Sequence, residues 1–253
     1  MKNAQRRQSH GWQRAGQLKA VNTATLTLIM TLGASADARA GLFGFGGDTW
    51  QEEVLLHDGR KIIVRRSQTY GGSREPGQSG PIEEHSVRFT LPGSGQPITW
   101  TSEYSGDIGR ANFQLLAVHA LNGTPYIVAS PNLCLSYNKW GRPNPPYVVF
   151  QHDGHEWRQI SLQALPREFK TVNVVLSIQK HQAQELIASG VTFSQTIADV
   201  NRGSEIPEFR SIVREPLAKE RINEKCMEMV YYKGSWVGPG DSIGKRMLDS
   251  KSK

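Results

Sequence analysis

Two histidines and two acidic residues occur within five positions, in the stretch His152-Asp153-Gly154-His155-Glu156. Imidazole nitrogens and carboxylate oxygens are ligands for Zn²⁺ and similar divalent ions. Asp-Gly is also typical of a tight turn between two strands, and the residues on either side of such a turn diverge. A third ligand from elsewhere would be needed. The pattern therefore favours a polar turn without metal or other cofactor, and His152 and His155 are the alternative metal ligands.

A second group of polar and aromatic residues follows Cys134 in the stretch SYNKWGRPNPPYVVF. Flat rings and amides recur at recognition surfaces because they stack and form hydrogen bonds with little loss of entropy. Such a surface would suit a sugar or a peptide. The alternative is mechanical, because the prolines fix φ and would hold residues 141–146 extended as a stiff bridge to the next strand. The candidate binding residues are Tyr137, Asn138, Trp140, Arg142 and Asn144.

A set of carboxylates and one histidine allows a hydrolase hypothesis. Glu83, Glu84, Glu103 and Asp107 could supply paired carboxylates, and His119 could act as a base. Glycoside chemistry depends on the separation of its two carboxylates, which sequence distance does not fix. His119 lies in an expected strand, where a histidine is more often a surface or satisfied core residue. No Gly-x-Ser-x-Gly pattern of a nucleophile elbow occurs. We expect no catalytic residue, and a hydrolase is the alternative.

The first forty residues have the features of a secretory signal. Positive residues precede the apolar run LTLIMTLGASA, and small residues, Ala38 and Ala40, stand where a signal peptidase inspects the chain. We expect cleavage after Ala40 and a periplasmic or secreted product; an uncleaved anchor or a disordered tail is the alternative. The apolar run is too short for a spanning helix, and no later run is long enough, so we expect no transmembrane segment in the mature chain.

The two cysteines, Cys134 and Cys226, both lie in the expected exported part. In an oxidising compartment an even pair is most simply one disulfide. It would close a loop of roughly 90 residues, which contributes about 4–5 kcal/mol in the chain-entropy model. Two buried free thiols are the alternative.

The formal charge of +7 belongs largely to the leader. Residues 1–40 hold six Lys or Arg and one Asp, which leaves 24 basic and 22 acidic residues in the remainder. A nucleic-acid interface needs a basic face on the folded domain, and this balance does not require one. We therefore expect no nucleic-acid partner.

Turn signals divide the chain into short strands. Asp58-Gly59, Asn122-Gly123 and Asp153-Gly154 each stand between apolar or β-branched runs, which is typical of β-hairpins. The apolar run at 169–178 predicts a further buried strand. The sequence thus predicts a mainly β (α+β) fold, an antiparallel sandwich or barrel-like sheet with a short helical insertion.

We expect a single domain over residues 41–253. Residues 70–84 are rich in Gly, Ser and Pro and predict a flexible loop. Polar stretches with apolar residues at helical spacing predict the helical insertion at 180–203. Residues 207–217 have strand-like character, and the basic tail at 241–253 is expected to fray.

Three stretches resemble a group of uncharacterised exported proteobacterial proteins: DIGRANFQLLAVHALNGTPYIVASP, SPNLCLSYNKWGRPNPPYV and REPLAKERINEKCMEMVYYKGSWV. The resemblance covers most of the expected mature chain and implies export. The group has no established activity, so no site residue is carried over. The function we expect is a non-catalytic envelope protein that binds another envelope protein or a small ligand. The alternative is an envelope hydrolase acting on a glycan or an ester.

Overall fold

The computed structural model describes residues 47–71, 80–176 and 178–251, and these residues form the mainly β fold that the sequence predicts. All of them belong to one unit, Gly41–Lys253. The expected signal peptide lies outside the described residues, and so do positions 72–79 of the expected loop. The loop expected at 70–84 is shorter than predicted, because β2 includes Tyr70 and β3 begins at Ile82. In the described part of the chain, no helix is long and apolar enough to span a membrane.

The strands are β1 (Asp48–Leu55), β2 (Lys61–Tyr70), β3 (Ile82–Thr90), β4 (Pro97–Ser102), β5 (Tyr104–Ser105), β6 (Arg110–Ala111), β7 (Phe113–Leu121), β8 (Thr124–Pro131), β9 (Val148–His152), β10 (Trp157–Ile160), β11 (Val191–Thr192), β12 (Val230–Tyr232) and β13 (Ser235–Val237). The helices are α1 (Leu133–Lys139), the short 3-10 helix η1 (Leu162–Ala164), α2 (Lys180–Ser189), α3 (Ser194–Arg202), α4 (Pro207–Arg210), α5 (Lys219–Lys225) and α6 (Ser242–Lys251).

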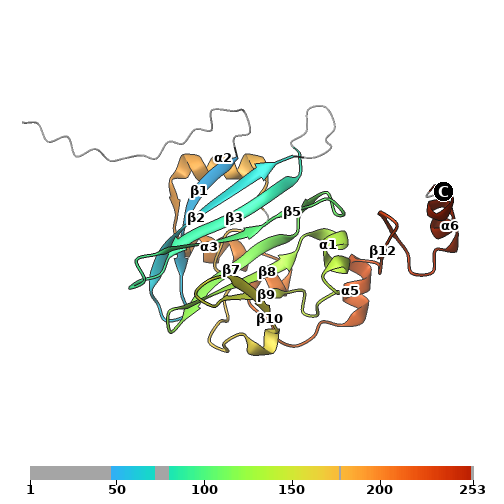
Figure 1. Cartoon of the computed structure of the whole chain (residues 1–253). Coiled ribbons are helices and arrows are strands. Elements are labelled where there is room, and N and C mark those ends of the chain that lie inside the picture. The colour runs from blue at the N-terminus through green and yellow to red at the C-terminus, as the bar shows by residue number, and fades with distance from the viewer. Residues whose placement is uncertain (1–46, 72–79, 177, 252–253) are drawn as a thin grey trace, which may run out of the picture. The chain divides into compact units, whose positions relative to one another are not determined.

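Two sheets face each other across the main core (Figure 1). The first has the order β11-β1-β2-β3-β4, with β11 parallel to β1, and the second has the antiparallel order β10-β9-β8-β7. The hairpins predicted at the three Asp-Gly and Asn-Gly turns are confirmed, and their glycines have φ of 84°, 79° and 100°. Those positive values explain glycine there, because a side chain would strain the backbone.

The second sheet is covered on both faces. Leu115, Val118 and Ile127 face the first sheet, whereas Leu116 and Val128 belong to a second core that includes residues from 165–172. A sheet buried on both sides needs apolar residues at nearly every position rather than at alternate ones. This explains why β7 and β8 have almost continuous apolar sequences.

The segment 169–178 is buried, but the prediction that it forms a sheet strand is wrong. In the described part, its pairing with distant backbone is a bridge from Thr171 to Ser211 and a bond from the Asn173 N–H to the Leu116 carbonyl of β7. Side chains satisfy much of the rest: Glu52 Oε2 accepts from the Val175 N–H at 3.0 Å. Because buried peptide groups need partners, a segment with such polar side chains around it can be buried without joining a ladder.

Asn173 joins the two sheets within this segment. Its Nδ2 donates to the carbonyl of Leu55 in β1 at 3.0 Å and to that of Val118 in β7 at 2.8 Å. Its Oδ1 accepts from the Val118 N–H at 2.9 Å. One step along the chain, Asn201 of α3 donates to the Val174 carbonyl at 2.9 Å. The segment therefore closes the gap between the β1 side of one sheet and the β7 edge of the other.

A buried ionic network lies at one end of the core. Arg66 Nη1 is 2.7 Å from Glu52 Oε1 and 2.6 Å from the Val175 carbonyl, and the side chains of Arg66 and Glu52 are 2% and 0% exposed. Trp50 Nε1 also donates to Glu52 Oε1 at 2.7 Å. Burial, and secondly the charge of Arg66, hold the pKa of His85 well below its usual value, so its neutral ring accepts from Arg66. The network links β1, β2 and β3 to the 169–178 segment, which we call the crossing segment.

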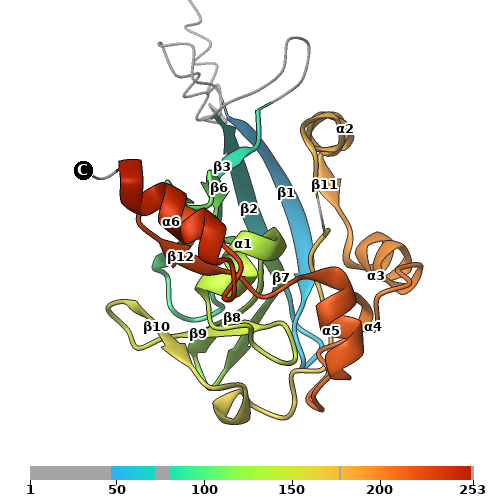
Figure 2. The same cartoon turned by 90° about the vertical axis from the view of Figure 1, so that its right-hand side faces the viewer.

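The helical insertion predicted at 180–203 contains α2 and α3, which lie along β1 (Figure 2).

Two further helices occupy stretches where the sequence predicts other structure. The strand-like stretch from 207 instead begins with α4, because Pro207 fits the first turn of a helix. The tail predicted to fray contains α6, which Asp241 caps by accepting from the Gly244 N–H at 2.8 Å. Asp249 of α6 also accepts from the Tyr232 hydroxyl at 2.8 Å.

Glu52→Gln tests the buried network. The neutral amide leaves the Arg66 charge buried without a counter-ion, so we expect a loss of about 3–5 kcal/mol in the free energy of unfolding. Lys61→Gln is the control, because it breaks the exposed Lys61–Glu53 pair on neighbouring positions of the same sheet and should cost under about 1 kcal/mol. Urea unfolding followed by circular dichroism measures both. Equal losses in the two variants would contradict the importance of this network.

Candidate functional site

The stretch from Ser136 to Phe150 begins as a helix and then turns, so the prediction that residues 141–146 run extended is wrong at Gly141 and Arg142. Residues 133–139 contain no proline and form α1, and the Ser136 hydroxyl fixes the helix by donating to the Asn112 carbonyl. The chain then turns sharply, with Gly141 and Arg142 at positive φ, before β9 begins at Val148. The five candidate binding residues therefore lie on α1 and in the turning segment that follows it.

Asn138 connects α1 to the C-terminal part of the chain. Its Oδ1 accepts from the Met229 N–H at 2.9 Å and from Arg142 Nη1 at 3.0 Å. Its Nδ2 donates to the carbonyls of Cys134 at 2.9 Å and Met227 at 3.0 Å. All hydrogen-bonding capacity of this amide is directed inward. We call the contacts of Asn138 with Met227 and Met229 the Asn138 clamp.

Other members of the candidate surface also make internal contacts. Trp140 Nε1 donates to Asn112 Oδ1 at 3.1 Å, and its ring packs on Phe113 with centroids 4.5 Å apart. Asn144 exchanges two hydrogen bonds with the backbone of Leu217, at 2.7 and 2.9 Å. These contacts favour the mechanical role of the stretch over that of a displayed binding surface.

The predicted disulfide between Cys134 and Cys226 is confirmed. Cys134 lies in α1 and Cys226 directly follows α5, with their Cα atoms 5.3 Å apart. The Arg142 guanidinium adds to this junction, since Nη2 donates to the Cys226 carbonyl at 3.0 Å and the group lies over the Tyr137 ring at 5.1 Å. Covalent and polar contacts thus hold α5 and the residues after it against α1.

A cavity of about 520 Å³ lies beside the disulfide. Its walls come from α1, the start of β7, the end of β8, α4 and α5. The apolar side chains that line it are Leu133, Tyr137, Ile206, Phe209, Leu217 and Ile222. The polar ones are Gln114, Ser130, Asn132, Glu208 and Arg221. Its size and mostly apolar lining are those of a small-molecule site.

The charged residues of this cavity pair with each other. Glu208 is 3% exposed, and its Oε2 lies 2.8 Å from Arg221 Nη2. The Tyr137 hydroxyl is buried without a hydrogen-bond partner among the described residues, and burial raises the pKa of this phenol. The cavity wall is therefore mostly apolar, and its charged residues Glu208 and Arg221 form an ion pair with each other.

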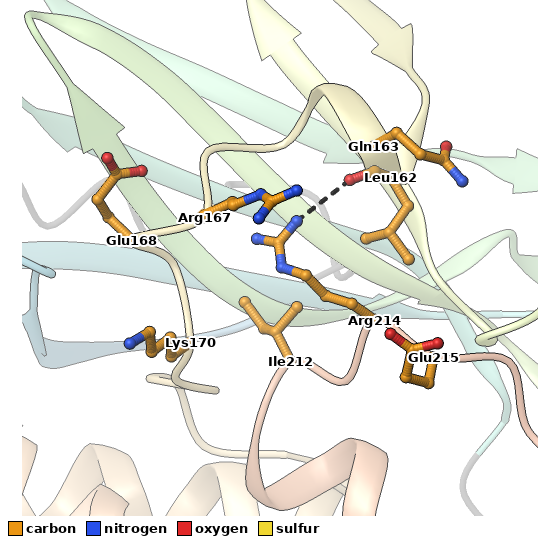
Figure 3. Close-up of a pocket in the computed structure, with 8 residues that line it drawn as sticks. All are labelled: Leu162, Gln163, Arg167, Glu168, Lys170, Ile212, Arg214 and Glu215. Carbon is orange, nitrogen blue, oxygen red and sulfur yellow. Dashed lines mark hydrogen bonds between the residues drawn. The ribbon is translucent and has the colours of Figure 1, made fainter.

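A second, more open depression of about 750 Å³ lies between residues 162–170 and 212–215 (Figure 3). Arg214 holds its wall together by donating to the carbonyls of Leu162, Leu165 and Pro166 at 3.3, 3.0 and 2.7 Å. A hollow of about 430 Å³ adjoins it and shares Leu162, Gln163, Arg214 and Glu215.

The histidine-rich turn has the contacts of a polar hairpin turn. His152 Nδ1 accepts from the Gly154 N–H at 3.1 Å, and Asp153 Oδ1 accepts from the N–H groups of His155 and Glu156 at 2.9 Å. These two N–H groups lower the pKa of the Asp153 carboxyl. No cluster of three metal-ligating side chains occurs in the described part of the chain. The geometry gives no support to His152 and His155 as ligands.

The structure does not place the residues of the hydrolase hypothesis in one site. His119 is 0% exposed, stacks on Phe169 with centroids 4.6 Å apart, and makes a polar contact of 3.0 Å with the Thr171 carbonyl. Asp107 instead pairs with Lys139 at 2.7 Å. Glu83 and Glu84 lie on β3, and Glu103 lies between β4 and β5. A base enclosed in the core cannot reach a substrate.

The sequence did not predict the cavity residues at the start of α4 and just before it. Ile206 and Phe209 are three residues apart, a helical spacing, within a stretch interpreted as a strand. The sequence does carry a signal for α5, since Ile222 and Cys226 are four residues apart, a helical spacing. Neither pattern indicates that α4 and α5 face α1, because sequence spacing within a helix does not determine its packing partner.

Asn138→Ala should loosen the residues that the clamp holds. Without the side-chain acceptor, we expect hydrogen exchange of the Met229 amide to become roughly tenfold faster. Asn144→Ala is the matched control, because it removes an amide from the same turn but releases Leu217 instead. Exchange measured by mass spectrometry or NMR distinguishes them. Unchanged protection at residues 227–229 in Asn138→Ala would show that the clamp contributes nothing.

His119 should make stability depend on pH. Burial, partly opposed by the bond to Thr171, lowers its pKa from 6.5 to about 4. Between these values the unfolded chain binds a proton that the folded chain does not, so stability falls as pH drops, by about 3 kcal/mol at pH 4. We expect His119→Gln to lose less stability than the wild type between pH 7 and 4.5 in urea unfolding, although His85 acts in the same direction.

The control for this measurement is His181→Gln, which replaces a histidine exposed on α2. It should retain the pH dependence of the wild type, because this exposed side chain lies outside the core that encloses His119. Identical pH dependence in His119→Gln and the wild type would contradict the assignment.

Comparison with protein-family models, curated proteins and solved structures gives no match to this chain. The resemblance to uncharacterised exported proteobacterial proteins therefore stays a prediction.

Proposed function

We propose that the protein is a non-catalytic, exported envelope protein that binds an uncharged, largely apolar ligand in the cavity beside the Cys134–Cys226 disulfide. The observation that carries this proposal is the cavity itself. A volume of about 520 Å³ with mostly apolar walls and a few polar groups is typical of sites that enclose a small molecule.

The charges in the cavity favour an uncharged ligand. A carboxylate or ammonium ion placed there would lose its hydration, and Glu208 and Arg221 already form a pair. An apolar ligand loses no such hydration and removes its own surface from water, at about 25 cal/mol for each Å² buried. The polar wall residues Gln114, Ser130 and Asn132 leave room for a ligand with some neutral hydrogen-bonding groups.

The proposed export rests on the leader and the disulfide. A disulfide is compatible with an oxidising compartment, and it borders the proposed site. Cleavage after Ala40, which would release the chain to the periplasm or beyond, remains part of the proposal. In such a compartment the bond between α1 and α5 would persist and keep the cavity walls together.

Ile222→Trp tests the site by filling it. The larger side chain on α5 should occupy the cavity, and we expect the affinity for an uncharged solvatochromic dye, Nile red, to fall about tenfold or more. Ile243→Trp is the matched control, because it adds the same ring to α6, where Ile243 is 64% exposed and lies outside the cavity. Fluorescence titration measures both variants, and urea midpoints verify their folding. Equal dye affinity in folded Ile222→Trp and the wild type would refute the site.

A further inference from the structure

The open depression in Figure 3 has cationic groups at its centre. Arg167, Lys170 and Arg214 line it together with Glu168 and Glu215. In the figure the guanidinium groups of Arg167 and Arg214 point toward the same part of the depression, whereas the two carboxylates lie toward its sides. The positive and negative groups are thus separated rather than paired.

Arg214 is fixed in place without a carboxylate partner. Its two Nη atoms donate to four carbonyls of the 162–169 segment, at distances from 2.7 to 3.4 Å. Carbonyls satisfy the N–H groups but leave the net positive charge uncompensated. The Nε–H has no acceptor among the described residues. Arg214 is therefore a preorganised cation with one donor left for a ligand.

Arg167 and Lys170 add charge that no described residue pairs. Neither side chain makes a hydrogen bond or an ion pair with any residue in the described ranges, although Glu168 is next to Arg167 in sequence. Arg167 lines the same depression as Arg214, and an anion bound there would offset the repulsion between the two cations. An oxyanion accepts several charge-assisted hydrogen bonds from such a pair, which are among the strong hydrogen bonds of proteins.

We propose that this depression binds a phosphate group, held between Arg167 and Arg214. The exposed Arg167 guanidinium suits phosphate because its planar donors match two of its oxygens, and Arg214 adds its Nε–H and its positive charge. Ile212 and Leu162 provide an apolar floor and wall that leave the oxyanion less hydrated there. The carboxylates of Glu168 and Glu215 exclude a second anion at the sides, so one phosphate is expected.

The adjoining hollow of about 430 Å³ would accommodate the rest of a phosphate ester. It continues from Arg214 along Leu162 and Gln163, and its far side is formed by Pro143, Pro145 and Tyr147. The lining of the hollow as a whole is part polar and part apolar, which fits a small organic group esterified to the phosphate. The site is separate from the cavity beside the disulfide and does not depend on the function proposed for it.

Titration with inorganic phosphate tests the proposal. In the full exported chain, arginine side-chain NMR signals should shift saturably with phosphate, compared with sodium chloride of equal ionic strength. Arg167→Gln should raise the dissociation constant roughly tenfold or more, because a charge-assisted bond is lost. Arg65→Gln is the matched control: it removes an exposed arginine on β2 and should change nothing. Equal phosphate affinity in Arg167→Gln and the wild type, or a shift that does not saturate, would overturn the proposal.

Two further arms distinguish a soluble phosphate ester from a lipid headgroup. Glycerol phosphate is titrated in solution, and sedimentation is measured with vesicles of phosphatidylglycerol against vesicles of phosphatidylcholine. Saturation by glycerol phosphate without sedimentation identifies a soluble ester, and sedimentation that Arg167→Gln abolishes identifies a headgroup. Behaviour independent of Arg167 in both arms overturns the site. Nile red affinity should stay unchanged in Arg167→Gln, so the two proposals fail separately.

Discussion

The Glu52–Arg66 ion pair holds the segment that joins the two sheets against the first of them. Removing two charges from water costs several kcal/mol for each ion, and the pair is tolerated only because its other hydrogen bonds are also satisfied. Arg66 completes its set with His85 and the Val175 carbonyl, and Glu52 completes its own with Trp50 and the Val175 N–H. The segment that includes Val175 is therefore held by polar contacts of the first sheet, not by a strand ladder.

The course of this crossing segment determines which part of the chain covers the outer face of the second sheet. Because residues 172–176 pass between β1 and β7, the chain before them covers the outer face of β7 and β8, and the chain after them reaches α2 beside β1. Arg214 then fastens the 162–169 segment to the chain that leads into α5. Arg214 lines the open depression, and because its Nη atoms donate to carbonyls, its positive charge stays uncompensated there.

The cavity beside the disulfide depends on a second set of constraints. α1 and α5 are distant in sequence, and the Cys134–Cys226 bond and the Asn138 clamp hold them together across the ends of β7 and β8. The polar residues after Cys134 face this junction, so their amides and guanidinium are used in building the walls.

The sequence alone determined the hairpins, the mainly β class and the disulfide. Asp-Gly and Asn-Gly turns and alternating strands are local signals, and two cysteines permit one intramolecular pair. It did not determine that residues 169–178 would be buried outside a ladder, because an apolar run looks the same whether backbone or side chains satisfy its peptide groups. Nor did it show that Asn138 and Arg142 face inward, that His119 lies in the core, or that Phe209 and Ile222 line one cavity. Those outcomes depend on which distant segments meet, and only the tertiary structure decides that.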